Sequence, residues 1–359
     1  MMTHLQKFQQ RLVGKADAAL IFSPQNQRYL CDFPFSDGYL LIFQNKALLL
    51  TDDRYVEAAR AGAGKDFTVL SPRGGVLAAI PELLKDEGAK LLLLEECHVT
   101  LALREALGVR LEGIELLTGA STILGDLRIC KDKREIDAIL CAQKITDDAF
   151  AHILNTIRPD MTEVEVALEL EFFMRRAGSE GVAFNTIAVS GAASSMPHGV
   201  PRDVKLERGF LTMDFGARID GYCADMTRTV VIGKADAEMK HLYETVLKAQ
   251  RAALDVAALG VPCRSLDTAA RDVIDGAGYE GLFTHSLGHG VGLDVHEAPR
   301  AARSAAPDEL LAVGHVVTVE PGIYIEGKYG CRIEDMIVIG EDGKANDITA
   351  SPKHLIELC

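Results

Sequence analysis

Along residues 1–125, short apolar runs alternate with segments whose apolar residues recur at helical spacing. Short apolar runs between polar residues predict buried strands, whereas apolar spacing of three or four residues predicts amphipathic helices. The alternation predicts an α/β domain whose strands run in mixed directions. The predicted strands are 18–22, 39–43, 47–50, 67–70 and 90–94, and the predicted helices are 54–61 and 76–87.

Longer amphipathic segments and β-rich runs make up the rest of the chain. Asp132 with Glu135, and Thr162 with Glu165, each match a capping box, in which two side chains satisfy free backbone N–H groups where a helix begins. We expect a boundary within 119–128, with one domain at 1–125 and an α+β domain at 126–359, its antiparallel strands packed under helices. The predicted helices are 132–156, 162–176, 237–259 and 265–276.

An Asp220-Gly221 pair between two β-rich runs predicts a β-hairpin with a two-residue turn. Counting outward from the turn places Asp214 opposite Thr227, with Asp225 two residues away on the same sheet face. Diagonal neighbours lie about 7–8 Å apart, so the two aspartates can hold cations between them. Thr227 can then donate a hydrogen bond to a ligand carboxylate. Taken alone, the hairpin fits a solvated pair of aspartates at least as well.

Three histidines, His285, His289 and His296, lie close together and are interleaved with glycines, in a chain that has 10 histidines. Glycine lets the backbone bend and approach a site closely. His289 is the candidate for a metal-ligating nitrogen. His285 and His296 are candidates for carrying protons or donating to a substrate.

Two acidic residues follow or interrupt β-branched runs nearer the C-terminus: Glu320 after 316–319, and Glu334 within 330–339. A charge in such a strand is costly unless it is paired or coordinated. Arg332 alternates onto the same strand face as Glu334, where a guanidinium can orient a carboxylate or bind a substrate oxygen.

Four carboxylates and one imidazole thus form a candidate ligand set. Gathered in one place, the carboxylates repel one another and resist desolvation unless cations neutralise them. Oxygen donors with a single nitrogen suit a pair of divalent ions such as Mn²⁺, Co²⁺ or Zn²⁺. The pattern of apolar and polar positions does not by itself bring these segments together. The set is Asp214, Asp225, His289, Glu320 and Glu334.

Read in order, these segments resemble the metallopeptidase clan that contains methionine aminopeptidase, aminopeptidase P and prolidase. The resemblance covers residues 130–359, and 26–33 is a weaker match to the N-terminal domain of proline-directed members. It implies a "pita-bread" α+β domain behind a smaller α/β domain. The matching motifs are Met213-Asp214-Phe-Gly-Ala, Asp220-Gly-Tyr-Cys-Ala-Asp225-Met-Thr-Arg-Thr, His285-Ser-Leu-Gly-His289-Gly-Val-Gly, Val295-His296-Glu-Ala-Pro-Arg, Val319-Glu320-Pro-Gly-Ile-Tyr and Arg332-Ile-Glu334-Asp.

The resemblance also implies roles for individual residues. The five candidate ligands would hold two metal ions, bridged by Asp225 and Glu334, and Glu320 would also act as general acid and base towards a bridging water. His198, in a segment that is a loop by composition, resembles the clan's proton-shuttling histidine. The positions that proline-specific members use around the substrate are matched by His285, His296 and Arg332.

The predicted function is a two-metal exopeptidase that cleaves the bond between an N-terminal residue and proline. A metal pair lowers the pKa of a bridging water, and one metal can bind the substrate's α-amine. An Xaa-Pro aminopeptidase is favoured over an Xaa-Pro dipeptidase (prolidase), which must hold a free carboxylate close to the proline. Mn²⁺ is the preferred ion, with Co²⁺ or Zn²⁺ possible, and short proline-containing peptides are the expected partners. The resemblance implies a homodimer.

Three other relatives fit the chain less well. Methionine aminopeptidase shares the five ligands but usually lacks a separate N-terminal domain and an arginine at the position of Arg332. Creatinase-like amidinohydrolases share the fold but have no metal site. A non-catalytic binding relative would have lost ligands, and all five are present here.

Composition and net charge argue against two classes of binding partner. The chain has 359 residues, 48% hydrophobic and 25% charged, with a formal net charge of −14, which argues against nucleic acid or a membrane surface as a partner. No apolar run approaches the ~18 residues of a membrane span, and residues 1–15 lack the apolar core of a signal peptide. The eight cysteines are scattered, without a C-x-x-C pair. They predict reduced thiols and a cytoplasmic protein.

Overall fold

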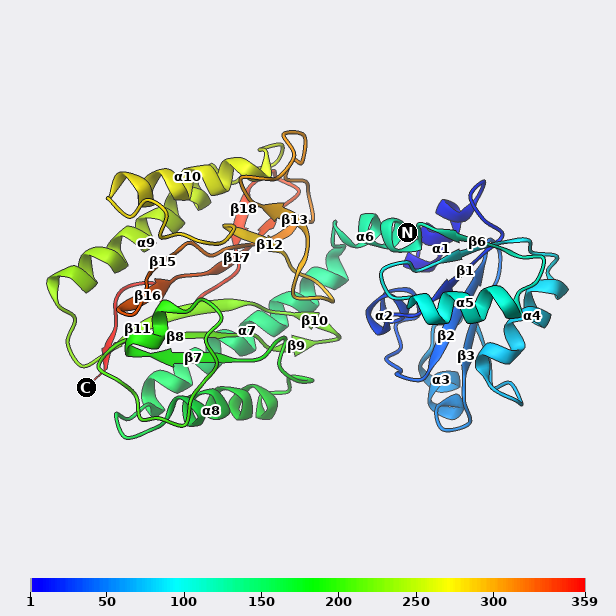
Figure 1. Cartoon of the computed structure of the whole chain (residues 1–359), viewed down its shortest axis with the longest axis horizontal. Coiled ribbons are helices and arrows are strands. Elements are labelled where there is room, and N and C mark those ends of the chain that lie inside the picture. The colour runs from blue at the N-terminus through cyan, green and yellow to red at the C-terminus, as the bar shows by residue number, and fades with distance from the viewer. Residues whose placement is uncertain (1, 359) are drawn as a thin grey trace. The chain divides into compact units, whose positions relative to one another are not determined.

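The computed structural model in Figure 1 describes residues 2–358 and divides into two compact units between Arg128 and Ile129. Within this described part, no helix has both the length and the apolar composition of a membrane span. The cysteines that the structure describes are free thiols, and Cys359 lies outside the described residues.

The N-terminal unit is a mixed sheet covered by helices (Figure 1). Its strands are β1 (Ala18–Ile21), β2 (Gly38–Phe43), β3 (Ala47–Thr51), β4 (Phe67–Leu70), β5 (Leu91–Leu94) and β6 (Glu115–Thr118). Its helices are α1 (His4–Leu12), α2 (Pro24–Cys31), α3 (Val56–Gly62), α4 (Val76–Asp86), α5 (Leu101–Arg110) and α6 (Ala120–Arg128). The strand order is β4-β3-β2-β1-β5-β6, and β1 pairs antiparallel with β2 but parallel with β5. The predicted α/β pattern of mixed direction is confirmed.

Several elements of this unit are missing from the sequence prediction. Helix α6 occupies the segment expected to be a domain boundary, and α1, α2, α5 and β6 were not predicted. Start signals were nevertheless present: Thr3 caps α1 in a capping box with Gln6, and Ser23 caps α2 ahead of Pro24. Such short helices are marginal by themselves, so their stability comes from packing.

The C-terminal unit has two main sheets and two pairs of long helices (Figure 1). Its helices are α7 (Lys133–Thr156), α8 (Glu163–Arg176), α9 (Ala237–Val256), α10 (Cys263–Gly276) and the short 3₁₀ helix η1 (Gly191–Ser195). Its strands are β7 (Ile187–Ser190), β8 (Gly209–Phe215), β9 (Arg218–Ile219), β10 (Tyr222–Cys223), β11 (Met226–Ile232), β12 (Gly288–Gly290), β13 (Glu297–Ala301), β14 (Val316–Val319), β15 (Gly322–Ile325), β16 (Tyr329–Arg332), β17 (Asp335–Ile339), β18 (Ala345–Asp347) and β19 (Glu357–Leu358).

Each sheet of this unit packs under its own pair of helices. The first sheet, ordered β19-β11-β8-β7, packs with α7 and α8, and the second, ordered β13-β12-β14-β17-β18, packs with α9 and α10. Both predicted capping boxes are present, at Asp132 before α7 and at Thr162 before α8. The expected α+β arrangement of strands under helices is confirmed.

The hairpin register agrees with the prediction. Asp214 of β8 faces Thr227 of β11, and Ile219 of β9 faces Tyr222 of β10 across the turn. Asp220 has φ 49° and the next residue φ 81°, as the two central positions of a type I′ turn require. The ladder is not continuous, because an irregular segment separates β8 and β11 from the small β9–β10 ribbon.

The run 330–339 also differs from the single strand expected. It forms β16 and β17, which belong to different sheets, with Ile333 and Glu334 between them. Arg332 ends β16 and pairs with Gly322 of β15, whereas Asp335 begins β17 and pairs with Val319 of β14. The chain therefore crosses from one sheet to the other at Glu334.

A prediction concerns the irregular part of the hairpin. A Cβ atom on Gly216 would lie 1.8 Å from the carbonyl oxygen of Ala224, so Gly216→Ala is expected to lower the free energy of unfolding by about 2 kcal/mol or more. Chemical denaturation measures this change. The matched control is Gly276→Ala at the exposed end of α10, where a Cβ meets nothing within 4 Å. Equal stability of both variants would contradict the close approach.

Candidate metal centre and its cavity

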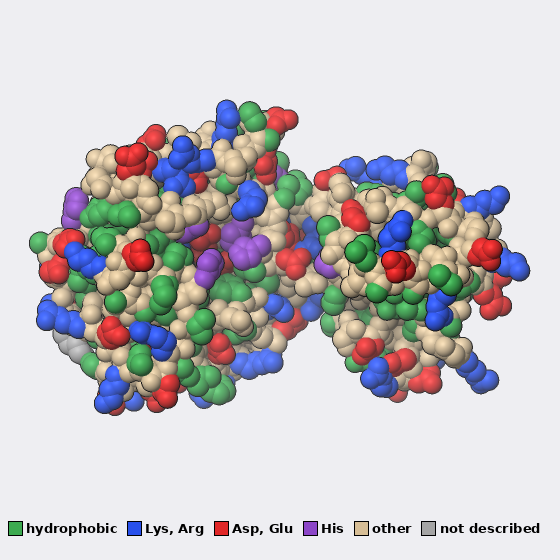
Figure 2. Space-filling model, viewed as in Figure 1, with side chains coloured by type: hydrophobic (Ala, Val, Ile, Leu, Met, Phe, Trp, Pro, Cys, Tyr) green, Lys and Arg blue, Asp and Glu red, His purple; other side chains and the backbone are tan. Residues whose placement is uncertain are grey.

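The predicted site residues surround one cavity of about 1100 Å³ in the C-terminal unit. Figure 2 shows histidine side chains gathered beside acidic ones around a hollow of this unit. The five candidate ligands come from the ends of strands in both main sheets, which the sequence pattern could not bring together. The predicted residues lining the cavity are His198, Asp214, Asp225, His285, His289, His296, Glu320, Arg332 and Glu334.

The donor atoms lie close to one another. The His289 Nε2 atom is 3.6 Å from Asp225 Oδ2 and 3.4 Å from Glu320 Oε1. One ligand atom from each of Asp225, His289 and Glu334 falls within 4.8 Å of the others. The set has the size and the donor chemistry of a site for divalent ions.

The imidazole of His289 is oriented for ligation. Its Nδ1 atom lies 3.0 Å from the carbonyl oxygen of Gly290, which can only accept, so Nδ1 carries the hydrogen and Nε2 faces the carboxylates. Burial lowers the pKa of His289, but its hydrogen bond with Glu320 and that residue's charge raise the pKa above the ordinary value of 6.5. Without a metal ion, the imidazole thus tends to hold a proton where a cation would bind.

The carboxylates show how costly the cluster is without cations. Burial, and then the negative charge of its neighbours, raises the pKa of Asp225 and of Glu334 well above the ordinary values. Burial also raises the pKa of Asp214. Burial acts the same way on Glu320, but its hydrogen bond with His289 and that residue's charge outweigh burial and lower its pKa to about 2. Glu320 is therefore the carboxylate that stays ionised.

Two buried carboxylate oxygens are free to ligate a cation. Asp214 Oδ1 and Glu334 Oε1 are buried and, within residues 2–358, have no hydrogen-bond partner. A carboxylate oxygen is an acceptor, so in a dry site it needs either a donor or a metal ion. Together with the oriented imidazole, these two oxygens support a resident pair of divalent ions.

Arg332 holds the carboxylates from one side. Its Nη2 atom donates to Asp214 Oδ2 at 2.6 Å, and its Nε atom donates to Thr227 Oγ1 at 2.8 Å. Thr227 Oγ1 in turn donates to Glu334 Oε2 at 2.8 Å. The predicted hydrogen bond from Thr227 to a ligand carboxylate is thus present, and so is the predicted contact of Arg332 with a ligand carboxylate.

Tyr324, which the sequence analysis did not identify, connects Arg332 to His285. Arg332 Nη1 donates to the Tyr324 hydroxyl at 2.9 Å, and that hydroxyl lies 2.9 Å from His285 Nε2. His285 Nδ1 lies 2.8 Å from the carbonyl oxygen of Ser286. Burial raises the pKa of Tyr324 to about 12, so the phenol keeps its proton. Because both ring nitrogens of His285 contact protein groups, a positioning role fits it better than proton carrying.

His198 and His296 are the exposed histidines of the cavity. The His296 ring packs edge-on against that of His289, with centroids 4.3 Å apart and an interplanar angle of 70°. His198 follows η1 in a loop that Arg332 holds by donating to the carbonyl oxygen of Pro197 at 3.2 Å.

A buried carboxylate missed by the sequence analysis, Glu163, fixes both ends of the His198 loop. It accepts from the backbone N–H of Ser190 at 2.7 Å and from Arg202 Nε at 2.8 Å. Since the first turn of α8 carries Glu163, the helix holds the loop against the cavity. The capping-box pattern indicates Thr162 and Glu165, but it gives no role to Glu163.

Comparison with known proteins assigns both units to described domain families. Residues 137–341 match the metallopeptidase family M24, and residues 4–130 match the creatinase/prolidase N-terminal domain. The fold and the site define a metal-dependent hydrolase. This chain belongs to the metallopeptidase family M24.

Relatives match along nearly the whole chain. The uncharacterized peptidase YqhT of Bacillus subtilis is 42% identical over 95% of this chain and 96% of its own length. An Xaa-Pro dipeptidase from Bacillus anthracis is similar in structure, with TM-score 0.94 and 37% identity over 99% of both chains. An X-Pro aminopeptidase from Thermotoga maritima has TM-score 0.90 and 39% identity, covering 98% of this chain and 99% of its own. The resemblance to proline-directed metallopeptidases is confirmed.

A second prediction follows from the raised pKa values of Asp225, Glu334 and His289. Below a raised pKa the metal-free group is protonated, so a cation must displace that proton. Binding of Mn²⁺ or Co²⁺ should therefore release protons, and affinity should fall as pH is lowered from 8 to 6. Calorimetry in two buffers of different ionisation enthalpy measures the release. Equal heats in both buffers, with affinity independent of pH, would contradict the linkage.

Proposed function

We propose that this chain is an exopeptidase that hydrolyses the bond between an N-terminal residue and a following proline. The observation that carries the proposal is the convergence of five metal-type donors, two with unpartnered buried oxygens, in one cavity. The names of its structural relatives, a dipeptidase and an aminopeptidase for proline-containing substrates, support the substrate class. The residues proposed to hold the two ions are Asp214, Asp225, His289, Glu320 and Glu334.

A bound pair of divalent ions supplies a water of lowered pKa and a Lewis acid for the scissile carbonyl. Mn²⁺ is the ion we propose, because the donor set is mostly carboxylate. Glu320, whose pKa is lowered to about 2, is ionised and can accept the proton of the attacking water at its carboxylate. The same group can return that proton to the departing proline nitrogen.

Other side chains of the cavity would act on the substrate. His198 lies on the loop at the cavity and is exposed, so its imidazole can hydrogen-bond to the substrate carbonyl or move a proton. Arg332 fixes Asp214, and His285 supports Arg332 through Tyr324. Proline has a bulky ring and, once in a peptide bond, no N–H, so its pocket needs apolar walls. Such walls are supplied by Phe184, Ile187, Pro197, Val200 and Val295.

An Xaa-Pro dipeptidase is the second candidate, and Arg300 favours it. The sequence alone favours an aminopeptidase, which leaves the far side of the substrate open. Arg300 lines the cavity and is exposed. Burial and then the neighbouring His289 lower the pKa of His296, and the charge of Arg300 makes a smaller contribution in the same direction. A guanidinium binds carboxylates strongly, often through two hydrogen bonds. Arg300 is thus placed to bind the free carboxylate of an Xaa-Pro dipeptide.

A substrate comparison tests both candidates. With defined Mn²⁺, the protein should hydrolyse Xaa-Pro and Xaa-Pro-Yaa peptides, and the chelated protein should hydrolyse neither. Arg300→Met should raise KM for Xaa-Pro at least about tenfold, the effect of losing a charged hydrogen bond, while KM for Xaa-Pro-Yaa changes little. Equal effects on both peptides would remove Arg300 from carboxylate binding. Full activity after exhaustive chelation would overturn the metal-dependent proposal.

The role of His198 has its own test. His198→Ala should lower kcat about 100-fold, the usual contribution of a positioned acid or base, and should leave the metal content unchanged because His198 is not among the proposed ligands. Metal analysis of the purified variant provides the control. Loss of metal in this variant would show that His198 acts on the ion site rather than on the substrate.

A further inference from the structure

The metal-type donors of the cavity are divided between two sheets. Asp214 lies in β8 and Asp225 directly precedes β11 of the same sheet, whereas His289 lies in β12, Glu320 directly follows β14 and Glu334 directly precedes β17 of the other sheet. A metal pair tolerates only small errors in the positions of its ligands. The spacing of the donors therefore depends on how firmly the two sheets are joined at this point.

The sheets are joined directly at Thr227 and Glu334. The backbone N–H of Glu334 donates to the carbonyl oxygen of Thr227 at 3.1 Å, and the Thr227 hydroxyl donates to the Glu334 carboxylate at 2.8 Å. Thr227 lies in β11, two residues after the candidate ligand Asp225. The contact therefore connects the strand that follows one candidate ligand with a second candidate ligand, Glu334. By itself, the contact consists of one backbone hydrogen bond and one side-chain hydrogen bond.

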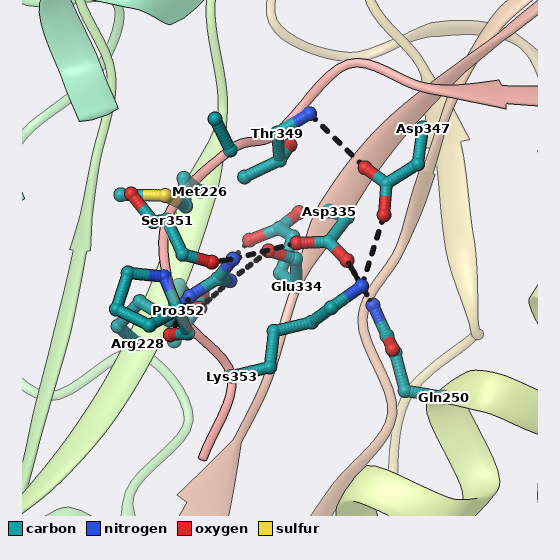
Figure 3. Close-up of polar contacts among 12 residues, drawn as sticks. Met226, Arg228, Gln250, Glu334, Asp335, Asp347, Thr349, Ser351, Pro352 and Lys353 are labelled. Carbon is teal, nitrogen blue, oxygen red and sulfur yellow. Dashed lines mark hydrogen bonds and ion pairs between the residues drawn. The ribbon is translucent and has the colours of Figure 1, made fainter. Parts of the chain in front are cut away.

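Arg228 reinforces this junction from behind. It follows Thr227 on β11, so its side chain lies on the sheet face opposite to that of Thr227. Its Nη1 atom donates to both carbonyl oxygens of the junction, that of Thr227 at 3.0 Å and that of Glu334 at 2.5 Å. Its Nη2 atom donates to Asp335 Oδ1 at 2.7 Å, as Figure 3 shows.

The remaining donors of Arg228 bind the segment near the C-terminal end. Nη2 donates to the carbonyl oxygen of Ser351 at 2.9 Å, and Nε donates to that of Pro352 at 3.1 Å. Gln250 and Lys353 both donate to the other oxygen of Asp335 (Figure 3). All five N–H groups of the guanidinium thus donate hydrogen bonds. The side chains of Arg228 and Asp335 at the centre of this network are 1% and 0% exposed.

A buried ion pair is a weak source of stability, because desolvation offsets much of the attraction between the charges. Its usual benefit is that it specifies one geometry. Here a planar guanidinium bridges two carbonyl oxygens at fixed positions, that of Thr227 in β11 and that of Glu334 directly before β17. A lysine ammonium keeps the charge, but its point geometry cannot reproduce five directed hydrogen bonds.

We propose that Arg228 is a positioning residue that sets the separation of the metal-binding carboxylates by locking Thr227 to Glu334, with Asp335 as its counter-charge. Arg228 lines no part of the cavity and touches neither substrate nor ion. The inference rests on the proposed metal site. It adds a residue that acts on metal geometry through the backbone of a ligand.

Arg228→Lys in the full chain tests the proposal. Affinity for Co²⁺, measured by calorimetry, should fall about 10- to 100-fold, as when a hydrogen-bond partner of a metal ligand is lost. The visible absorption spectrum of bound Co²⁺ should also change, because it reports ligand geometry. A purely structural role would lower stability, measured by chemical denaturation, without altering the spectrum of the folded protein.

Two matched controls separate positioning from the docking of the C-terminal segment. Asp147 accepts hydrogen bonds from Ser351 N at 2.9 Å and from Ala350 N at 3.1 Å. Asp147→Asn therefore loosens the same segment but leaves the donors of Arg228 in place. Lys353→Met removes one partner of Asp335 and likewise spares Arg228. Both variants should keep the wild-type Co²⁺ affinity and spectrum.

The outcomes distinguish this inference from the proposed function. If the wild-type protein binds no divalent ion, the proposed function fails. If the wild type binds Co²⁺ and Arg228→Lys binds it with the same affinity and spectrum, the positioning role alone is overturned. Should Arg228→Lys not fold, Asp335→Asn, which keeps the shape but removes the counter-charge, is judged by the same two measurements. Changes in Co²⁺ affinity and spectrum as large in the two controls as in Arg228→Lys would also overturn the positioning role.

Discussion

Repulsion among buried carboxylates is the constraint on which the C-terminal unit depends. Asp214, Asp225, Glu320 and Glu334 share one cavity, and burial together with neighbouring charge raises the pKa of most of them. Cations relieve this repulsion only if the donors stay in place between metal-binding events. The surrounding hydrogen bonds from Thr227 and Arg228 of β11 and from Arg332 of β16 provide that fixed frame.

Local signals allowed part of this arrangement to be predicted from sequence. The Asp220-Gly221 turn fixed the hairpin register, so the opposition of Asp214 and Thr227 follows by counting. Capping boxes located the starts of α7 and α8. The convergence of the histidine segment and the last strands came only from the family resemblance. It depends on how two sheets pack, and no local periodicity encodes that packing.

Residues whose partners lie far along the chain were missed for the same reason. Tyr324 has the pattern of an ordinary strand residue until Arg332 and His285 are brought to its hydroxyl. Glu163 and Arg228 look like a helix-start carboxylate and a strand charge, and their partners lie up to 39 and 124 positions away. In the N-terminal unit the failure was different, since capping signals were present and were overlooked.

The hydrogen bonds from Arg332 through Tyr324 to His285 run in one direction. A guanidinium has no acceptor atom, so the order of donors cannot be reversed. Consequently these groups cannot relay a proton from His285 to Asp214. The Tyr324 hydroxyl donates to His285 Nε2, and the Arg332 guanidinium cannot accept a proton. Acid–base exchange with the substrate is therefore left to the other titratable side chains that line the cavity, Glu320 and His198 among them.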